Sequence, residues 1–231
     1  MRPSDINAQY NVAAAGSLPV RIASHQRRKM YKAFLQSGVR PENTILDIGV
    51  TSDRSYDHSN YLEAWYPYPA KITAIGIDAG AAFLEKAHPG VRFLMGNGCM
   101  LPFADNSFDY VHSSAVIEHV GNRFKQMALM AEARRVTRNG VFITTPNCWF
   151  PIEFHTVLPL LHWLPPKVFR SILKATGRQF FADEANLNLL SVRQLRNMAR
   201  YIGFKDDYEV QGVRLGGIIS NILFVLRKRE R

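Results

Sequence analysis

The sequence predicts an α/β protein with a doubly wound, mostly parallel sheet and helices on both of its faces. Two observations predict it. Between residues 44 and 146, short apolar segments with the features of strands alternate with segments of helical periodicity. Each strand segment is apolar throughout, which is typical of parallel strands that are buried on both faces.

The elements follow one another in a regular order. An amphipathic helix is predicted over residues 23–37. It is expected to end there because Gly38 follows and Pro41 prevents its continuation. Strands are predicted at Thr44–Gly49, Lys71–Asp78, Val91–Gly96, Phe108–Ser114 and Gly140–Pro146, with helices at Ser59–Trp65, Gly80–Ala87 and Asn122–Val136. After a segment rich in proline and aromatic residues, helices are predicted at Lys167–Ala175 and Val192–Ile202, followed by two strand-like runs.

The composition favours one globular domain. The chain has 231 residues, 47% of them hydrophobic, and we find no linker or repeat that divides it. Cys99 and Cys148 are too few for a disulfide scaffold and lack the spacing of metal ligands, so no metal site is predicted. We expect no transmembrane segment and no signal peptide, and therefore a cytoplasmic protein.

The charge is strongly positive. Lys and Arg number 29 against 19 Asp and Glu, a formal charge of +10. Basic residues cluster in residues 21–40, at Arg134, Arg135 and Arg138, and in the final RKRER. Such clusters attract an anionic surface or substrate, although solvated helix faces explain them equally well. Nucleic acid is an unlikely partner, because aromatic residues are not interleaved with the basic ones.

Polar residues close the predicted strands. Asp47 and Gly49 end the first strand and Asp78 ends the second, while Ser113 and Ser114 end the fourth. Ligands of doubly wound sheets bind at the carboxyl ends of the strands. An acid beside a glycine turn is suited to binding the hydroxyls of a ribose.

Four ordered motifs carry a family resemblance. ILDIG, GIDAG, GNGCMLPFADNSFDYVHSSAVIEHV and RRVTRNGVFITTPN resemble, in order and spacing, the class I S-adenosylmethionine-dependent methyltransferases, in particular the type 11 methyltransferase-domain group. The resemblance covers Thr44–Asn147. It implies a methyltransferase with a Rossmann-like, seven-stranded sheet whose last strand is antiparallel, and S-adenosyl-L-methionine as the cofactor.

The resemblance also implies roles for individual residues. Asp47, Gly49 and Thr51 are expected at the methionine part of the cofactor, and Ser113 and Ser114 at its amino-acid end. Asp78 is expected to bind the ribose hydroxyls. The residues expected around the adenine are Ala79, Asn97, Gly98, Cys99, Met100 and Leu101.

The glycine loop departs from the family pattern. The sequence D-I-G-V-T-S-D has one glycine where the family has three, and the polar stretch Thr51–Asn60 follows. The hydroxyl groups of Thr51 and Ser52 could contact the cofactor where the family uses the backbone of its second and third glycines. The stretch is either a surface insertion or a loop that closes over the methionine end, and we expect residues 51–58 to be mobile without ligand and ordered with it. Because the loop lacks G-x-G-x-x-G, a nicotinamide dinucleotide is disfavoured.

The segment from Thr145 to Pro166 is the candidate acceptor site. Glu153 and His155 stand among aromatic residues and, on an extended chain, would share one face. Together with His119 they are the predicted catalytic residues, with His155 as the preferred base because its unperturbed pKa lies near neutrality. An aromatic cap with no catalytic role is the alternative.

These expectations divide the single domain into four parts. They are an N-terminal helical extension (residues 1–43), a cofactor-binding core (44–147), an acceptor-side insertion or cap (148–190), and a C-terminal helix with strands (191–231). The expected acceptor is a small molecule, a sugar or a lipid-like compound, and the aromatic segment could also bring the protein to a membrane surface. A nucleic-acid methyltransferase and a catalytically inactive binding subunit remain alternatives. The sequence indicates no oligomeric state.

Overall fold

The computed structural model describes residues 17–56, 59–205 and 207–228. Its strands are β1 (Ile45–Ile48), β2 (Ile72–Gly76), β3 (Arg92–Met95), β4 (Phe108–Ser114), β5 (Thr137–Pro146), β6 (Tyr208–Leu215) and β7 (Ile218–Arg227). Its α-helices are α1 (Leu18–Gln36), α2 (Tyr61–Trp65), α3 (Phe83–Ala87), α4 (Arg123–Val136), α5 (Pro166–Ala175) and α6 (Val192–Tyr201). The parts of the predicted N-terminal extension and basic C-terminus at residues 1–16 and 229–231 lie outside the described residues.

The strands form one seven-stranded sheet in the order β3-β2-β1-β4-β5-β7-β6. Strands β1 to β5 pair in parallel, and β7 runs antiparallel to both β5 and β6. The predicted fold class, including the antiparallel last strand, is confirmed. The chain builds outward from β1 to β3 and then returns to place β4 beside β1. This reversal creates the crevice in which doubly wound sheets bind ligands.

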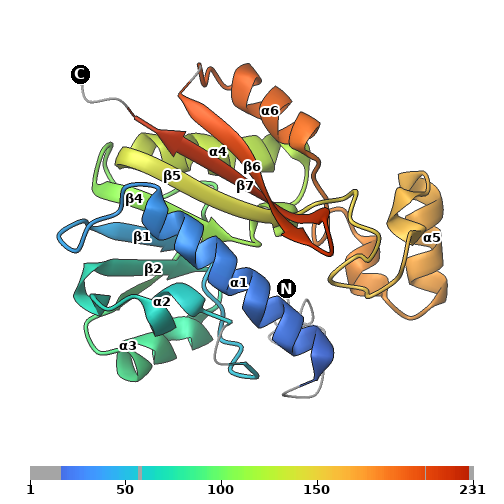
Figure 1. Ribbon diagram of the computed structural model, residues 1–231, viewed down its shortest axis with the longest axis horizontal. Coiled ribbons are helices and arrows are strands. Elements are labelled where there is room, and N and C mark those ends of the chain that lie inside the picture. Colours follow the sequence, from blue (N-terminus) through green and yellow to red (C-terminus); the bar gives the residue numbers. More distant parts are fainter. Residues whose placement is uncertain (1–16, 57–58, 206, 229–231) are drawn as a thin grey trace.

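Helices cover both faces of the sheet (Figure 1). On one face, α1, α2 and α3 contribute Phe34, Leu62 and Leu84 to a buried apolar cluster. On the other face, α4 and α6 contribute Leu129 and Leu195 to a second cluster. Two apolar layers therefore fix the sheet, and the polar residues at its carboxyl edge are left for a ligand.

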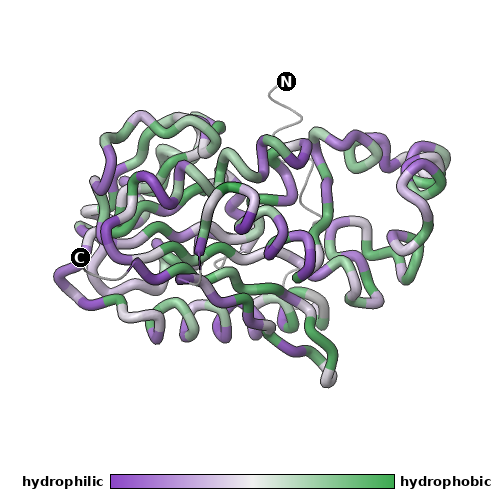
Figure 2. Tube along the Cα trace, turned by 90° about the horizontal axis from the view of Figure 1, so that it is seen from above, coloured by the Kyte–Doolittle hydropathy of each residue, from purple (hydrophilic) through white to green (hydrophobic). Residues whose placement is uncertain are grey.

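The segment between β5 and α6 forms a separate lobe with α5, which projects beyond one end of the sheet in both views (Figures 1 and 2). The lobe has its own small core around Phe169, Leu173 and Phe181. Its two ends meet at the sheet, where the Cys148 amide donates to the Leu190 carbonyl at 2.9 Å. The lobe is thus pinned at its base and lies at the carboxyl ends of the strands.

Several predicted boundaries are wrong. Helix α1 begins at Leu18, before the predicted Ala23, with a proline in its first turn, where no amide donor is needed. The predicted helix 80–87 is a 3₁₀ turn over Ala79–Ala82 followed by the short α3. Strand β5 begins at Thr137, directly after α4 and before the predicted Gly140. Among the described residues, no helix combines the length and apolarity needed to cross a bilayer.

Candidate functional site

The turn after β1 requires a glycine. Gly49 has φ +94°, and a Cβ at this position would lie 2.2 Å from Cγ2 of Val116. The Gly49 amide donates to the Ile75 carbonyl of β2 at 2.7 Å, which holds the turn against the neighbouring strand. The chain can therefore reverse closely over the end of the sheet only with glycine at this position.

A buried chain of hydrogen bonds lies beneath this turn. Asp47 on β1 is opposite His112 on β4, and Oδ1 of Asp47 is 2.7 Å from Nδ1 of His112. The other nitrogen of His112 is 2.8 Å from the Tyr61 hydroxyl of α2. The Glu63 carboxyl, also from α2, is buried beside them, with no hydrogen-bond partner of good geometry among the described residues. Three segments, β1, β4 and α2, thus place two carboxyl groups and an imidazole under the loop.

Burial controls the ionisation of this group. It raises the pKa of Asp47 to about 8 and lowers the pKa of His112 to about 4. Burial, followed by repulsion from Asp47, raises the pKa of Glu63 well above its usual range. At neutral pH His112 is therefore neutral, and the carboxyl pair retains protons.

We predict that this group makes the free energy of unfolding fall as pH rises from about 6.5 to about 8. Each carboxyl has a folded pKa above its unfolded value, so the folded state binds more protons there, and stability drops by up to about 1.4 kcal/mol per pH unit for each proton. His112 acts oppositely, but only between its folded pKa of about 4 and its unfolded pKa of roughly 6.5. The measurement is urea unfolding across the interval, with the wild type compared with the Asp47→Asn, Glu63→Gln double variant.

The double variant should show the smaller slope. The control is Glu209→Gln, which removes an exposed carboxylate on β6 and should keep the wild-type slope. Equal slopes in the wild type and the double variant would contradict the ionisation assigned here.

The stretch Thr51–Asn60 folds back on itself. The Thr51 amide donates to the Asn60 side chain, which donates in turn to the Thr51 carbonyl, both at 2.9 Å. Within this clamp, Ser59 donates to the Asp53 carboxylate at 2.7 Å. Helix α2 therefore begins after the predicted Ser59, and Asn60 occupies the cap position without a side-chain cap bond. Residues 57 and 58 of the predicted mobile loop lie outside the described residues.

Asp78 follows β2 at the same edge of the sheet. Its half-buried carboxylate accepts from the Gly80 amide at 2.8 Å through Oδ1. A Cβ at Gly80 would lie 2.9 Å from the Ser52 Cβ, so the loop after β1 reaches the Asp78 turn. Ala79 follows as an exposed residue. The structure thus brings the predicted ribose acid next to the predicted hydroxyl-bearing loop.

The predicted adenine residues form a tight turn after β3. The exposed Asn97 accepts from the Cys99 amide at 2.9 Å, and a Cβ at Gly98 would lie 2.6 Å from Cγ2 of Ile48. Met100 is 76% exposed, whereas Leu101 is buried. The turn therefore packs against β1 and presents the side chain of Met100 to a ligand.

The two serines that end β4 differ in access. Ser113 is fully buried and donates to the Ile48 carbonyl at 3.1 Å. Ser114 shares a hydrogen bond with Thr144 and lines a small cavity of about 20 Å³ together with Asp47, Gly49, Asn60 and His112. Of the two, Ser114 is the one placed to touch a ligand.

The three predicted catalytic residues meet at the base of the lobe. Nδ1 of His155 is 2.7 Å from Oε1 of Glu153, and Nε2 of His155 is 2.9 Å from Nε2 of His119. The segment is not extended at Glu153 and His155, as expected for two side chains on one face, but turns at residues 154–156. The Glu153 carboxylate instead accepts from the amides of His155 and Thr156 and thereby closes a turn.

The sequence analysis missed Glu118 in this cluster. Its carboxylate is fully buried and lies 4.0 Å from Nε2 of both His119 and His155. Oε2 accepts from the Thr145 hydroxyl at 2.9 Å. Its position next to His119 in the IEHV motif was the available signal.

These four groups have displaced pKa values. Burial raises the pKa of Glu118 to about 7 and lowers that of His119 to about 3. Burial also opposes the charged forms of Glu153 and His155, but their mutual attraction prevails. The pKa of Glu153 falls to about 2 and that of His155 rises above its usual value. Without another cation, the shared proton therefore lies on His155.

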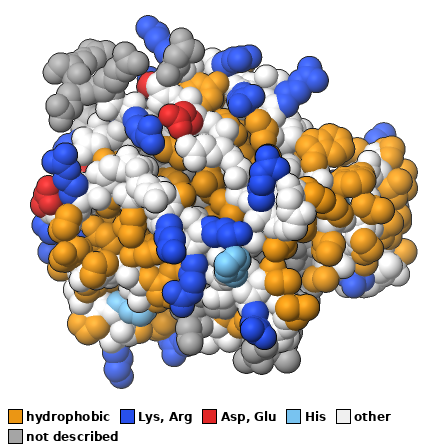
Figure 3. Space-filling view, viewed as in Figure 1, with side chains coloured by type: hydrophobic (Ala, Val, Ile, Leu, Met, Phe, Trp, Pro, Cys, Tyr) orange, Lys and Arg blue, Asp and Glu red, His pale blue; other side chains and the backbone are white. Residues whose placement is uncertain are grey.

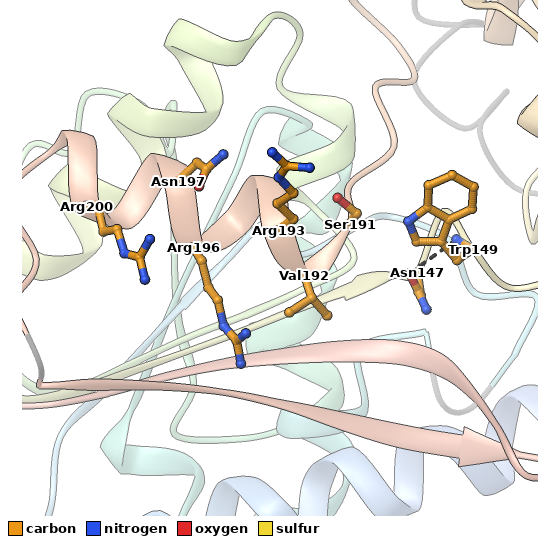
Figure 4. A pocket seen from close by; sticks show the side chains of 8 residues that line it. All are labelled: Asn147, Trp149, Ser191, Val192, Arg193, Arg196, Asn197 and Arg200. Atoms are coloured by element: carbon orange, nitrogen blue, oxygen red, sulfur yellow. Dashed lines mark hydrogen bonds between the residues drawn. The ribbon is translucent and has the colours of Figure 1, made fainter.

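The sequence analysis also missed a larger pocket of about 590 Å³ along α6. Arg193, Arg196 and Arg200 project from this helix, and Trp149 lies at the other end of the pocket (Figure 4). The arginines recur at helical spacing, which in a sequence alone is indistinguishable from a solvated face. Asn147, Ser191, Val192 and Asn197 complete the lining.

The sheet order and the polar crevice at β1 and β4 define the class of the protein: it has the Rossmann-like fold of class I methyltransferases. Comparisons with known proteins agree. Residues 46–144 match the family model described as a methyltransferase domain. A crystal structure of a SAM-dependent methyltransferase from Thermotoga maritima aligns with a TM-score of 0.58 over 92% of both chains, at 18% identity. Another from Methanosarcina mazei aligns with a TM-score of 0.54 over 84% of this chain and 96% of that one, at 17% identity.

Two curated relatives are similar in sequence. A protein of Encephalitozoon cuniculi with a provisional methyltransferase name is 31% identical over 48% of this chain and 48% of its own length. The demethylmenaquinone methyltransferase of Renibacterium salmoninarum is 25% identical over 79% of this chain and 76% of its own. The first match thus spans about half the relative. Residues 46–144 thus match a methyltransferase-domain model, and SAM-dependent methyltransferases of known structure share the fold of this chain.

Proposed function

We propose that this protein transfers a methyl group from S-adenosylmethionine to a small-molecule or lipid-like acceptor. The observation that carries the proposal is the carboxyl edge of the sheet, where Gly49 and Ser114 line one small cavity and Asp78 ends the neighbouring strand β2. A half-buried carboxylate can accept the ribose hydroxyls, and a cationic sulfonium or ammonium group above the loop would favour loss of a proton from the carboxyl pair beneath it.

The cofactor residues fit the group once the loop opens. The cavity beside Gly49 has the room of about one water molecule, and the Thr51–Asn60 clamp lies at its edge. We propose that cofactor entry displaces this clamp. The residues proposed to contact the cofactor are Asp47, Gly49, Thr51, Asp78, Ala79, Asn97, Gly98, Cys99, Met100, Ser113 and Ser114, with Ser113 acting through the backbone of β1.

The lobe over residues 148–190 is the proposed acceptor side. Bound S-adenosylmethionine would supply an electrophilic methyl group, and this chain's task is to hold an acceptor in line with it. Hydrophobic side chains gather on the lobe in Figure 3. Trp163 and Val168 of the lobe are 44% and 46% exposed. The pocket between Trp149 and the arginines of α6 offers an apolar end and a cationic end. An acceptor with an apolar body and an anionic group fits this surface best.

The relative named demethylmenaquinone methyltransferase supports an apolar acceptor. We propose that the reaction takes place in the cytoplasm, or at a membrane surface that the exposed apolar side chains of the lobe contact. Cys99 and Cys148 are free, in keeping with a reducing compartment.

The decisive experiment first measures the binding of the cofactor and then screens for the acceptor. Titration calorimetry should give a micromolar dissociation constant for S-adenosylmethionine, about −8 kcal/mol. A screen with methyl-labelled cofactor should then find turnover among apolar and anionic small molecules, sugars and lipids. Tight binding of a nicotinamide dinucleotide in place of S-adenosylmethionine would overturn the proposal.

Glu153→Gln and His155→Ala test the acceptor side. Glu153 and His155 are proposed to orient the acceptor and to receive its proton if it has one, so both variants should lower turnover at least about tenfold while keeping cofactor affinity. His88→Gln removes a histidine near β3, far along the chain from the lobe, and is the control. Loss of cofactor affinity in both variants, with the fold intact, would place this segment on the cofactor side.

A further inference from the structure

Three side chains at the base of the lobe point one ligand atom each toward a common centre. Glu118 and His119 come from the turn after β4, and His155 comes from the lobe. The ligand atoms lie within 4.8 Å of one another, and the side chains are between 0% and 14% exposed. The folded chain thus assembles two imidazoles and one carboxylate from segments that are far apart in the sequence.

The distances suit a bound ion. The two Nε2 atoms are 2.9 Å apart, and Oε1 of Glu118 is 4.0 Å from each of them. The centre of a triangle with these sides lies about 2.1 Å from each corner, within the range of zinc–nitrogen and zinc–oxygen bonds. An ion at that point lies in the plane of the three ligand atoms, and a tetrahedral ion displaced from that plane would need small shifts that move the two imidazoles apart.

The remaining polar atoms of these side chains already have partners. Nδ1 of His119 is 2.6 Å from the Asn186 carbonyl, and Nδ1 of His155 is 2.7 Å from Glu153. Oε2 of Glu118 accepts from Thr145. Metal-binding histidines characteristically donate their outer N–H to a carbonyl or a carboxylate, and such bonds leave Nε2 facing the metal.

The third ligand atom lacks a hydrogen bond. Among the described residues, Oε1 of Glu118 is buried and has no hydrogen-bond partner. Buried polar atoms in folded proteins almost always have a hydrogen-bond partner. An unpaired carboxylate oxygen beside two imidazole nitrogens is therefore a position where a cation would be stabilised.

We propose that Glu118, His119 and His155 bind a divalent transition-metal ion, with Zn²⁺ as the ion whose ligand types and bond lengths fit best. Imidazole ligands favour Zn²⁺ and its neighbours over Mg²⁺ and Ca²⁺. Three protein ligands leave a fourth position for water or an acceptor oxygen. The site stands independently of methyl transfer.

Metal binding is measured directly on tag-free, metal-stripped protein. Calorimetry with zinc chloride should give one equivalent bound with a micromolar or lower dissociation constant. Glu118→Gln keeps the acceptor for Thr145 but removes the charge, and should weaken binding at least about tenfold, as should His155→Gln. His88→Gln, outside the cluster, should bind as the wild type does.

X-ray absorption spectroscopy on the zinc-loaded wild type is a test that does not depend on the folding of any variant. It should show two imidazoles and oxygen, without sulfur, in the first shell. Absence of zinc binding by the wild type, sulfur ligation through Cys99 or Cys148, or unchanged affinity in the Glu118 and His155 variants would each overturn the proposal. Titrations of the same samples with S-adenosylmethionine test the proposed cofactor site separately from the metal site.

Discussion

Asp78→Ala should weaken the binding of S-adenosylmethionine by about 30-fold to about 1,000-fold, equivalent to about 2–4 kcal/mol. The reason is that one carboxylate would accept two ribose hydroxyls, and hydrogen bonds to a charged acceptor contribute more than neutral ones. Asp78 already orders its own turn through the Gly80 amide, so its orientation is set before the ligand arrives. Titration calorimetry measures the change.

Two further variants separate charge from structure. Asp78→Asn keeps an oxygen for the Gly80 amide and should lose less affinity than the alanine variant. Asp105→Ala removes an exposed carboxylate that pairs with Arg135 and should bind the cofactor normally. Affinity of Asp78→Ala equal to that of the wild type would remove the ribose site from this strand end.

Gly49→Ala should lower the free energy of unfolding by about 2–4 kcal/mol, because it adds a steric clash to an unfavourable backbone angle. The new methyl group would lie 2.2 Å from Val116, and the residue has φ +94°. Gly177→Ala is a matched control, since Gly177 has φ +75° but nothing within 4 Å of a Cβ. Urea unfolding of both variants isolates the steric part of the loss.

A double variant tests the cause of that loss. Val116→Ala shortens the clashing side chain, so the Gly49→Ala, Val116→Ala protein should recover part of the stability lost by Gly49→Ala alone. If Gly49→Ala costs no more than Gly177→Ala, the close packing of this turn against Val116 does not constrain the protein.

The order and type of the five parallel strands were predictable because short, mostly apolar runs alternate with segments of helical periodicity. Element ends were less predictable. β5 follows α4 with no turn residue between Val136 and Thr137, so no glycine or proline signals the change. Asp47 and Asp78 could be placed from their positions at the ends of strands. The contact of His119 with His155 depends on tertiary packing, and no local pattern encodes it.

The position of Glu118 in the cluster could not be predicted from the sequence either. A glutamate in a short motif suggests a surface residue, yet it is fully buried and faces two histidines. Likewise, Glu153 and His155 were expected to share one face of an extended chain. The carboxylate instead accepts amides within a turn, a use that strand periodicity does not reveal.

The pinned base of the lobe bears on how relatives of this protein can diverge. The backbone hydrogen bond from the Cys148 amide to the Leu190 carbonyl brings the two ends of the lobe together at the sheet, and the lobe has its own core. Once both ends of a segment are fixed, doubling the length between them costs only about 0.6 kcal/mol in closure entropy. Insertions, deletions or wholesale exchange of this segment can therefore accumulate in evolution without disturbing β1, β2 or β4. If the lobe is the acceptor side, as proposed, its exchange would change the acceptor while the residues at the strand ends are inherited intact.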